Sequence, residues 1–225
     1  MDVRSIRDKV YEQIRLDILK GVLGQGERVS VNDLAQRFHI SSQPVRDAII
    51  RLGEEGLVQV HPRRGTFVTT IPVSRIIEIN AAREMIESYA IEHIDVSAHQ
   101  DVLRDIEQAL EEMSAIRSRP QYEYLEYNAQ DFRFHLGTVM LAGNETITTM
   151  YRKLHPHYLY AMVMFNFATT TLGRHEDHEE IFMAIKSGHL REAAQTAERH
   201  TREATQTLLE LMNAAQAANA SAIPS

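Results

Sequence analysis

The chain of 225 residues contains no cysteine, which excludes a disulfide framework, a zinc site built from thiolates and a cysteine nucleophile. It also lacks any apolar run long enough to cross a bilayer, so we expect no membrane-spanning segment. The first nine residues contain no signal-peptide core, so the cytoplasm is the expected compartment. Hydrophobic residues at 44% and charged residues at 24% are ordinary for a folded chain.

Charge is divided unevenly along the sequence. Residues 1–71 carry 11 Lys and Arg against 9 Asp and Glu, whereas residues 72–225 carry 13 against 22. An acidic segment repels the phosphates of nucleic acid. Any contact with DNA is therefore expected from the N-terminal part.

The N-terminal part predicts three short helices followed by a hairpin. Apolar residues at positions 6, 10, 14 and 18 recur every four residues, as on one face of a helix. Ser30 and either Ser41 or Ser42 are suitable N-caps for two further helices. Two β-rich runs then flank Pro62-Arg63-Arg64-Gly65, which predicts a hairpin with a basic tip. This order is that of a winged helix-turn-helix, so we predict a DNA-binding domain over residues 1–71.

In such a domain the third helix lies in the major groove, with its first turn facing the bases. Side chains that can bond base edges or phosphates occupy that turn, namely Ser41, Ser42, Gln43 and, one turn further, Arg46. Arg63 and Arg64 on the hairpin can reach the adjacent minor groove or backbone. The alternative is a small helical domain whose arginines are ordinary surface charges. The ordered combination of three helices and a basic hairpin favours DNA binding.

Four sequence motifs within residues 1–71 together form a pattern typical of one protein family. They are Leu34-Ala35-Gln36-Arg37-Phe38, Ser41-Ser42-Gln43-Pro44-Val45-Arg46-Asp47-Ala48, Glu55-Gly56-Leu57-Val58 and Arg63-Arg64-Gly65-Thr66-Phe67-Val68. The pattern resembles the DNA-binding domain of GntR-family transcription regulators, which implies binding to a double-stranded DNA operator. Arg46 and Gly65 match the family, whereas Ser42 and Gln43 stand where Arg and Thr are typical. The family's usual operator therefore cannot be carried over to this chain.

From residue 72 onward the sequence predicts helices without strands. The expected ranges are 74–94, 97–118, 121–141, 145–170, 175–187 and 190–215. The tail from about residue 214 is rich in Ala and Asn and is expected to fray. The predicted fold class is mainly α, with an N-terminal winged helix-turn-helix followed by an all-helical bundle over residues 72–225.

Nine of the 11 histidines lie in this helical part, and three of them have informative spacing. Asp131 and His135 are four residues apart, so they project from one helix face. His178 and His200 each lie 11 residues from His189, near the turn between the last two helices, so they sit at the same height of an antiparallel hairpin. One carboxylate and three imidazoles that converge in a bundle are a good site for a divalent metal ion.

Other interpretations of these residues remain open. A single buried histidine is usually a hydrogen-bonded core residue, and His175 is an alternative to His178. Zinc is the first choice of metal, but nickel, manganese and iron also suit nitrogen-rich ligation. The same residues can hold a hydrolytic metal, although no His-Glu-x-x-His motif is present. A third possibility is a metal that serves only stability.

A second resemblance covers residues 75–210. The motifs Asp131-Phe132-Arg133-Phe134-His135, Ala142-Gly143-Asn144 and Asp177-His178-Glu179-Glu180, with His200, resemble the FCD effector domain of the FadR subfamily. All four positions match its metal-binding branch. The resemblance implies a homodimeric regulator, more often a repressor, that senses a small carboxylate such as a sugar acid or dicarboxylate. It also implies that Arg83 binds the effector, the alternative being a surface pair with Glu84 or Glu87.

Overall fold

The computed structural model describes residues 5–95, 97–121, 123–154 and 175–221, with side chains described as far as residue 214. Among these residues the chain forms two compact units, one that ends at Ile71 and one that begins at Pro72. The helical content and the small N-terminal sheet confirm the predicted fold class.

The first unit contains three helices and a three-stranded antiparallel sheet with the strand order β1-β3-β2. Its elements are α1 (Ile6–Leu19), β1 (Arg28–Val29), α2 (Val31–Arg37), α3 (Ser42–Glu54), β2 (Val58–His61) and β3 (Gly65–Val68). Ser30 caps α2 as predicted, because its hydroxyl accepts a hydrogen bond from the backbone amide of Asp33. Ser41 occupies the N-cap position of α3 without such a bond. The sequence did not predict β1, since two residues are too short to show an alternating pattern.

The core of the first unit lies between α1 and α3, which pack against each other. Val10, Ile14 and Ile18 of the predicted stripe are buried, whereas Ile6, the first residue of α1, is exposed. α2 packs against α3 and braces it, as the second helix of a helix-turn-helix does. The unit therefore holds α3 in a fixed position with one long face open to solvent.

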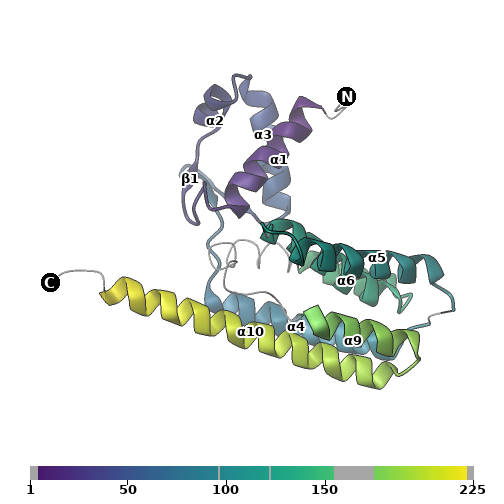
Figure 1. Cartoon of the computed structure of the whole chain (residues 1–225). Coiled ribbons are helices and arrows are strands. Elements are labelled where there is room, and N and C mark those ends of the chain that lie inside the picture. The colour runs from purple at the N-terminus through teal and green to yellow at the C-terminus, as the bar shows by residue number, and fades with distance from the viewer. Residues whose placement is uncertain (1–4, 96, 122, 155–174, 222–225) are drawn as a thin grey trace. The chain divides into compact units, whose positions relative to one another are not determined.

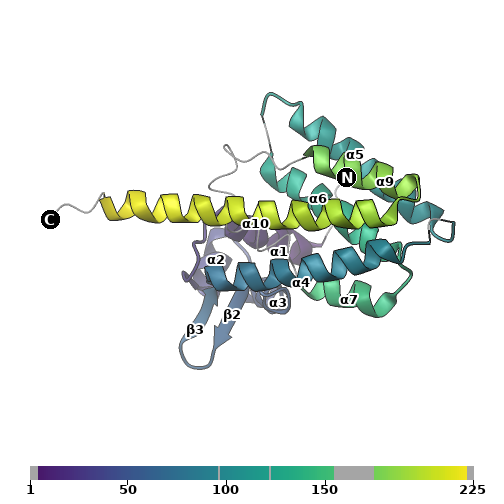
Figure 2. The same ribbon diagram turned by 90° about the horizontal axis from the view of Figure 1, so that it is seen from below.

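The second unit consists of helices in the described residues. They are α4 (Val73–Glu92), α5 (Gln100–Arg117), α6 (Tyr124–Met140), α7 (Glu145–Lys153), α9 (His175–Lys186) and α10 (Leu190–Ser221). α10 runs alongside α4, and α5 alongside α6 (Figures 1 and 2). The main core brings together apolar side chains of α5, α6, α9 and α10, including Ile106, Met113, Phe134, Ile181 and Ala194.

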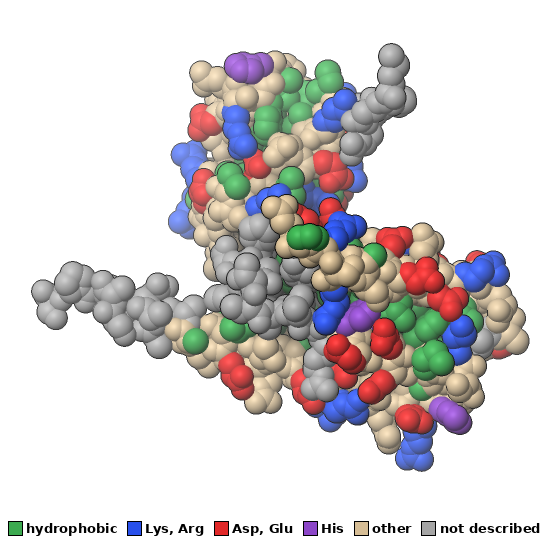
Figure 3. Space-filling model, viewed as in Figure 1, with side chains coloured by type: hydrophobic (Ala, Val, Ile, Leu, Met, Phe, Trp, Pro, Cys, Tyr) green, Lys and Arg blue, Asp and Glu red, His purple; other side chains and the backbone are tan. Residues whose placement is uncertain are grey.

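Close packing of α5 on α6 depends on Gly137. A Cβ atom built at this position would lie 2.5 Å from Cγ1 of Ile106, so a larger residue would push the helices apart. This contact keeps α6, which carries Asp131 and His135, fixed against the core. The surface of the second unit carries both acidic and basic side chains (Figure 3), and the ion pair of Lys186 with Glu107 joins α9 to α5.

Two helix predictions differ from the structure at their ends. α10 continues to Ser221, beyond the expected end at residue 215 and through the tail expected to fray. Alanine has the highest helix propensity, and the alanine-rich tail contains neither Gly nor Pro before Pro224. The helix expected over 145–170 is described as α7 to Lys153, and residues 155–174 lie outside the described residues. None of the described helices has both the length and the apolar character needed to cross a membrane.

Candidate functional site

The exposed face of α3 carries several of the side chains predicted to contact DNA. Gln43 and Arg46 are exposed, and so is Ser41 before the helix, while Ser42 is half-buried. The amide of Gln43 donates a hydrogen bond to Oδ1 of Asp47 at 2.7 Å, which orients it along the helix. Ile50, one turn beyond Arg46, is also exposed and was not anticipated. An exposed alkyl group on this face is suited to contact with a thymine methyl group.

The predicted basic hairpin is present between β2 and β3. His61 pairs with Gly65, and the exposed Arg63 and Arg64 lie in the turn between them. Arg63 has a φ of 63° and Gly65 a φ of 114°. A side chain at Gly65 would be strained, and its Cβ would lie 3.1 Å from Nε of Arg28. Glycine is therefore required for this turn.

The sheet brings a third arginine to the hairpin. Arg28 lies in β1 and pairs with Phe67 of β3, which places its exposed side chain beside Gly65. Arg28 could not be identified from sequence, because nothing in the two-residue strand indicates that it pairs with the hairpin. Three arginines together give this edge of the unit the positive charge that phosphate binding requires.

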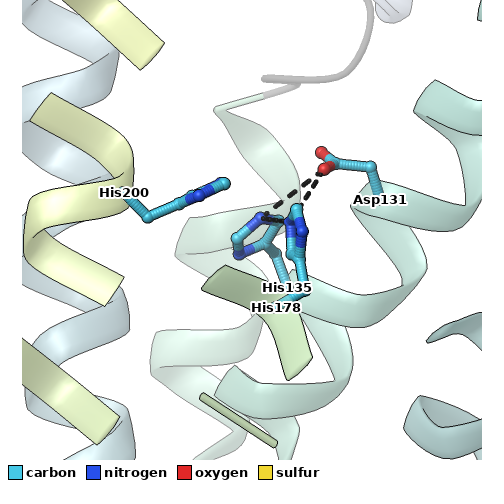
Figure 4. Close-up of side chains that lie close together, drawn as sticks. All are labelled: Asp131, His135, His178 and His200. Atoms are coloured by element: carbon cyan, nitrogen blue, oxygen red, sulfur yellow. Dashed lines mark hydrogen bonds and ion pairs between the residues drawn. The ribbon is translucent and has the colours of Figure 1, made fainter. Parts of the chain in front are cut away.

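The second unit brings Asp131, His135, His178 and His200 together, as their spacing predicted (Figure 4). One ligand atom from each residue lies within 4.8 Å of the others. Nε2 of His178 lies 3.1 Å from Oδ1 of Asp131 and 3.2 Å from Nε2 of His135. The three imidazoles are buried and the carboxylate is partly buried. Asp131 and His135 come from α6, His178 from α9 and His200 from α10.

Two further carboxylates lie beside the rear nitrogen of two of these imidazoles. Oε2 of Glu87, on α4, lies 3.0 Å from Nδ1 of His135, and Oδ2 of Asp177 lies 3.2 Å from Nδ1 of His200. Both carboxylates are buried. Metal-binding histidines characteristically place the other ring nitrogen against a carboxylate in this way, which directs Nε2 toward the ion. The donor set therefore fits a divalent metal ion.

Burial and charge favour the protonation states that bind a metal. Burial raises the pKa of Asp131, but the charge of His135 and the hydrogen bond from His178 outweigh it and hold the pKa well below its usual value. Burial lowers the pKa of His178, and burial together with neighbouring His178 lowers that of His200. An ionised Asp131 and neutral His178 and His200 are the forms in which these groups ligate metals. The cluster therefore suggests a metal site.

The alternative histidine lies beside this cluster and outside it. Nε2 of His175 is 2.6 Å from the hydroxyl of Ser114, and the His175 and His178 ring centres are 6.2 Å apart. Burial lowers the pKa of His175 as well. The geometry therefore selects His178, in agreement with the argument from equal height along the hairpin.

Arg83 is buried rather than on the surface. Its Nε donates a hydrogen bond to Oε1 of Glu87 at 3.0 Å, whereas Glu84 pairs with Arg202 of α10. From sequence, Glu87 was expected only as a surface partner of Arg83. Neither Glu87 nor Asp177 was predicted to support a histidine, because these contacts depend on how α4, α6, α9 and α10 pack.

Both units match known protein families. Residues 6–68 match the family of bacterial regulatory proteins named gntR, and residues 78–203 match the FCD domain. An uncharacterised HTH-type transcriptional regulator of Streptomyces ambofaciens is 28% identical over 82% of this chain and 77% of its own length. The gluconate operon transcriptional repressor of Bacillus subtilis is 24% identical over 80% of this chain and 75% of its own length.

A shorter match and a solved structure agree with these findings. The HTH-type transcriptional repressor RspR of Escherichia coli is 28% identical over 59% of this chain, a match that spans 57% of its own length. The crystal structure of a GntR regulator from Rhodococcus superposes with a TM-score of 0.70 at 21% identity, covering 92% of this chain and 99% of that one. The FCD match alone covers more than half of the sequence, so the chain belongs to the GntR family of transcription regulators, in the group that carries an FCD domain.

Proposed function

We propose that the chain is an operator-binding repressor whose helical unit senses a small carboxylic acid beside a bound divalent metal ion. The observation that carries the proposal is the cluster of Asp131, His135, His178 and His200, with Arg83 joined to it through Glu87. When bound, the metal, zinc first among the candidates, supplies a positive centre for a carboxylate.

The residues of the chain determine what such an acid must look like. A guanidinium can bind a carboxylate in a two-pronged arrangement, so Arg83 favours anionic effectors. A sugar acid or a dicarboxylate fits a site that has both a cation and this arginine. The relative from Bacillus subtilis is named for a gluconate operon, which supports a sugar acid as the first class to test.

The acid regulates only if it binds one state of the protein better than the other. We assign operator recognition to Ser41, Ser42, Gln43 and Arg46 at the start of α3. Arg63, Arg64 and the backbone of Gly65 contact the adjacent groove or phosphates, with Arg28 beside them. A repressor of this kind holds its operator without the acid and releases it when the acid binds.

A thermal-shift screen of small carboxylates with and without a chelator tests this function. An acid that binds the folded protein raises its melting temperature by mass action. We expect one class of acid to raise it, the chelator to abolish the rise, and the same acid to weaken operator binding. A metal that serves only stability would give a chelator effect without any response to acids. No response to either would contradict the metal-assisted sensor.

We also propose that the chain forms a homodimer through α4. Apolar side chains follow one another at intervals of four along its exposed side, namely Ile77, Ala81, Met85 and Tyr89. If two copies of α4 cross antiparallel, Ile77 meets Tyr89 and Ala81 meets Met85. The stripe is therefore complementary to itself, as a two-fold interface requires.

Replacing Met85 with Glu is expected to raise the dimer dissociation constant by roughly tenfold or more, because two charges would be buried at one interface. Sedimentation equilibrium measures this constant directly. Met183→Glu is the matched control, since Met183 is also an exposed methionine but lies on α9. Equal association of the Met85 variant and the wild type would remove α4 from the interface.

A further inference from the structure

Among the described residues, Glu87 is the one carboxylate that contacts both Arg83, which we propose binds the acid, and His135, which we propose binds the metal. Its Oε1 accepts hydrogen bonds from Nε of Arg83 at 3.0 Å and from the hydroxyl of Tyr151 at 2.7 Å. Its Oε2 lies 3.0 Å from Nδ1 of His135. These partners come from α4, α7 and α6, so one buried side chain joins three helices.

The arrangement gives each carboxylate oxygen a different task. Oε1 holds the guanidinium of Arg83, which would meet the anion, and Oε2 lies beside the ring of His135, which would ligate the metal. A carboxylate group is rigid and planar. If the carboxylate of Glu87 rotates when Arg83 moves, Oε2 must therefore also move relative to His135. Changes in an outer-shell partner alter the affinity of a metal site by about 10- to 100-fold.

Burial makes this coupling strong. Glu87 is 1% exposed, and a buried carboxylate is stable only while its partners compensate for lost hydration. The buried guanidinium of Arg83, whose Nε lies 3.0 Å from Oε1 of Glu87, supplies a compensating positive charge. A movement of Arg83 therefore changes the position of Glu87 relative to His135, because solvent does not reach the buried carboxylate to replace the lost contact.

We propose that Glu87 is a positioning residue that couples Arg83 to the metal ligand His135, so that the state of the arginine is transmitted to the metal site. This inference rests on the proposed function, because it names the residue that connects the acid-binding Arg83 to the metal site. It predicts a connection that exists before any acid binds, so the metal ion alone is a sufficient probe.

The test measures zinc affinity and the visible absorption spectrum of the Co²⁺-loaded protein. Glu87→Gln is expected to weaken zinc binding by about 10- to 100-fold. Arg83→Lys, which keeps the charge but loses the planar guanidinium, is expected to shift the Co²⁺ bands in the wild-type background and not in the Glu87→Gln background. Such non-additivity is the measure of coupling between two residues.

The matched control is Asp177→Asn, which alters the carboxylate on His200 instead of that on His135. It is expected to weaken zinc binding while the shift caused by Arg83→Lys persists. An equal shift in the wild-type and Glu87→Gln backgrounds would overturn the coupling, and so would unchanged zinc affinity in Glu87→Gln. A wild-type protein that binds neither metal would overturn it together with the metal site.

A variant that fails to fold does not prevent a decision. Circular dichroism identifies such a variant, and Arg83→Lys and Tyr151→Phe then serve alone, since neither residue belongs to the metal cluster. Both are expected to shift the Co²⁺ bands through Glu87, and an absence of shift in both would refute the inference. Failure of the proposed function is a separate result, namely wild-type operator binding that no acid alters.

Discussion

Replacing His178 with Ala is expected to remove nearly all of the zinc-dependent stabilisation of the protein. His178 is fully buried and its Nε2 lies within 3.2 Å of both Asp131 and His135, at the centre of the cluster. Loss of a direct ligand should cost more than the about 10- to 100-fold typical of an outer-shell partner. The metal would then be held by two imidazoles and a carboxylate.

The expected size follows from mass action. At a free zinc concentration of about 100 times the dissociation constant, binding stabilises the wild type by about 2.7 kcal/mol. If affinity falls about 100-fold, the gain at the same zinc concentration drops to about 0.4 kcal/mol. For a chain of this size, the wild-type gain corresponds to a rise in melting temperature of about 5–11 °C, most of which the variant should lose.

The measurement compares each protein with itself, zinc-loaded against chelator-treated, so that the cost of the cavity left by the imidazole cancels. His175→Ala is the matched control, because His175 lies three residues away on α9 and is also buried but is outside the cluster. The control should keep the zinc-dependent rise. A reversed pattern, with His175→Ala losing it, would transfer the ligand role to His175.

The ligand set could be predicted from sequence because helices impose simple spacing rules. A separation of four residues places Asp131 and His135 on one face, and equal distance from a turn places His178 opposite His200. Both rules require only that the helices exist and that α9 and α10 form an antiparallel pair. The three-helix unit and the hairpin were predictable for the same reason, since their periodicity, caps and turns are local.

Spacing rules cannot predict contacts between elements that are distant in the sequence, because those contacts depend on how the elements pack. Glu87 reaches His135 only because α4 lies against α6, and Arg28 reaches Gly65 only because β1 pairs with β3. The burial of Arg83 is of the same kind, since arginine is mostly exposed and its sequence neighbours offered acidic surface partners. The residues that support a site are therefore harder to predict than those that form it.

Replacing Arg46 with Ala is expected to weaken operator binding by about 5- to 150-fold, the equivalent of about 1–3 kcal/mol for a two-pronged contact to a base. Arg46 is exposed on α3 one turn beyond Ser42, and an exposed guanidinium in the first turns of such a helix can pair with guanine. Its side chain lies outside the buried core of the first unit, so folding should be unaffected. Fluorescence anisotropy on the native operator, at a fixed salt concentration, measures the change.

Arg64→Ala separates base recognition from phosphate contact. Arg64 is exposed in the turn of the hairpin. If it contacts a phosphate, its loss should reduce the slope of the logarithm of the binding constant against the logarithm of salt concentration by about one. Arg46→Ala should instead relax the preference at one base pair and preserve discrimination elsewhere. If both variants reduce affinity uniformly across operator sequences, Arg46 contacts only phosphate. Sequence recognition would then fall to Ser41, Ser42 and Gln43, with the exposed Ile50 on the same helix.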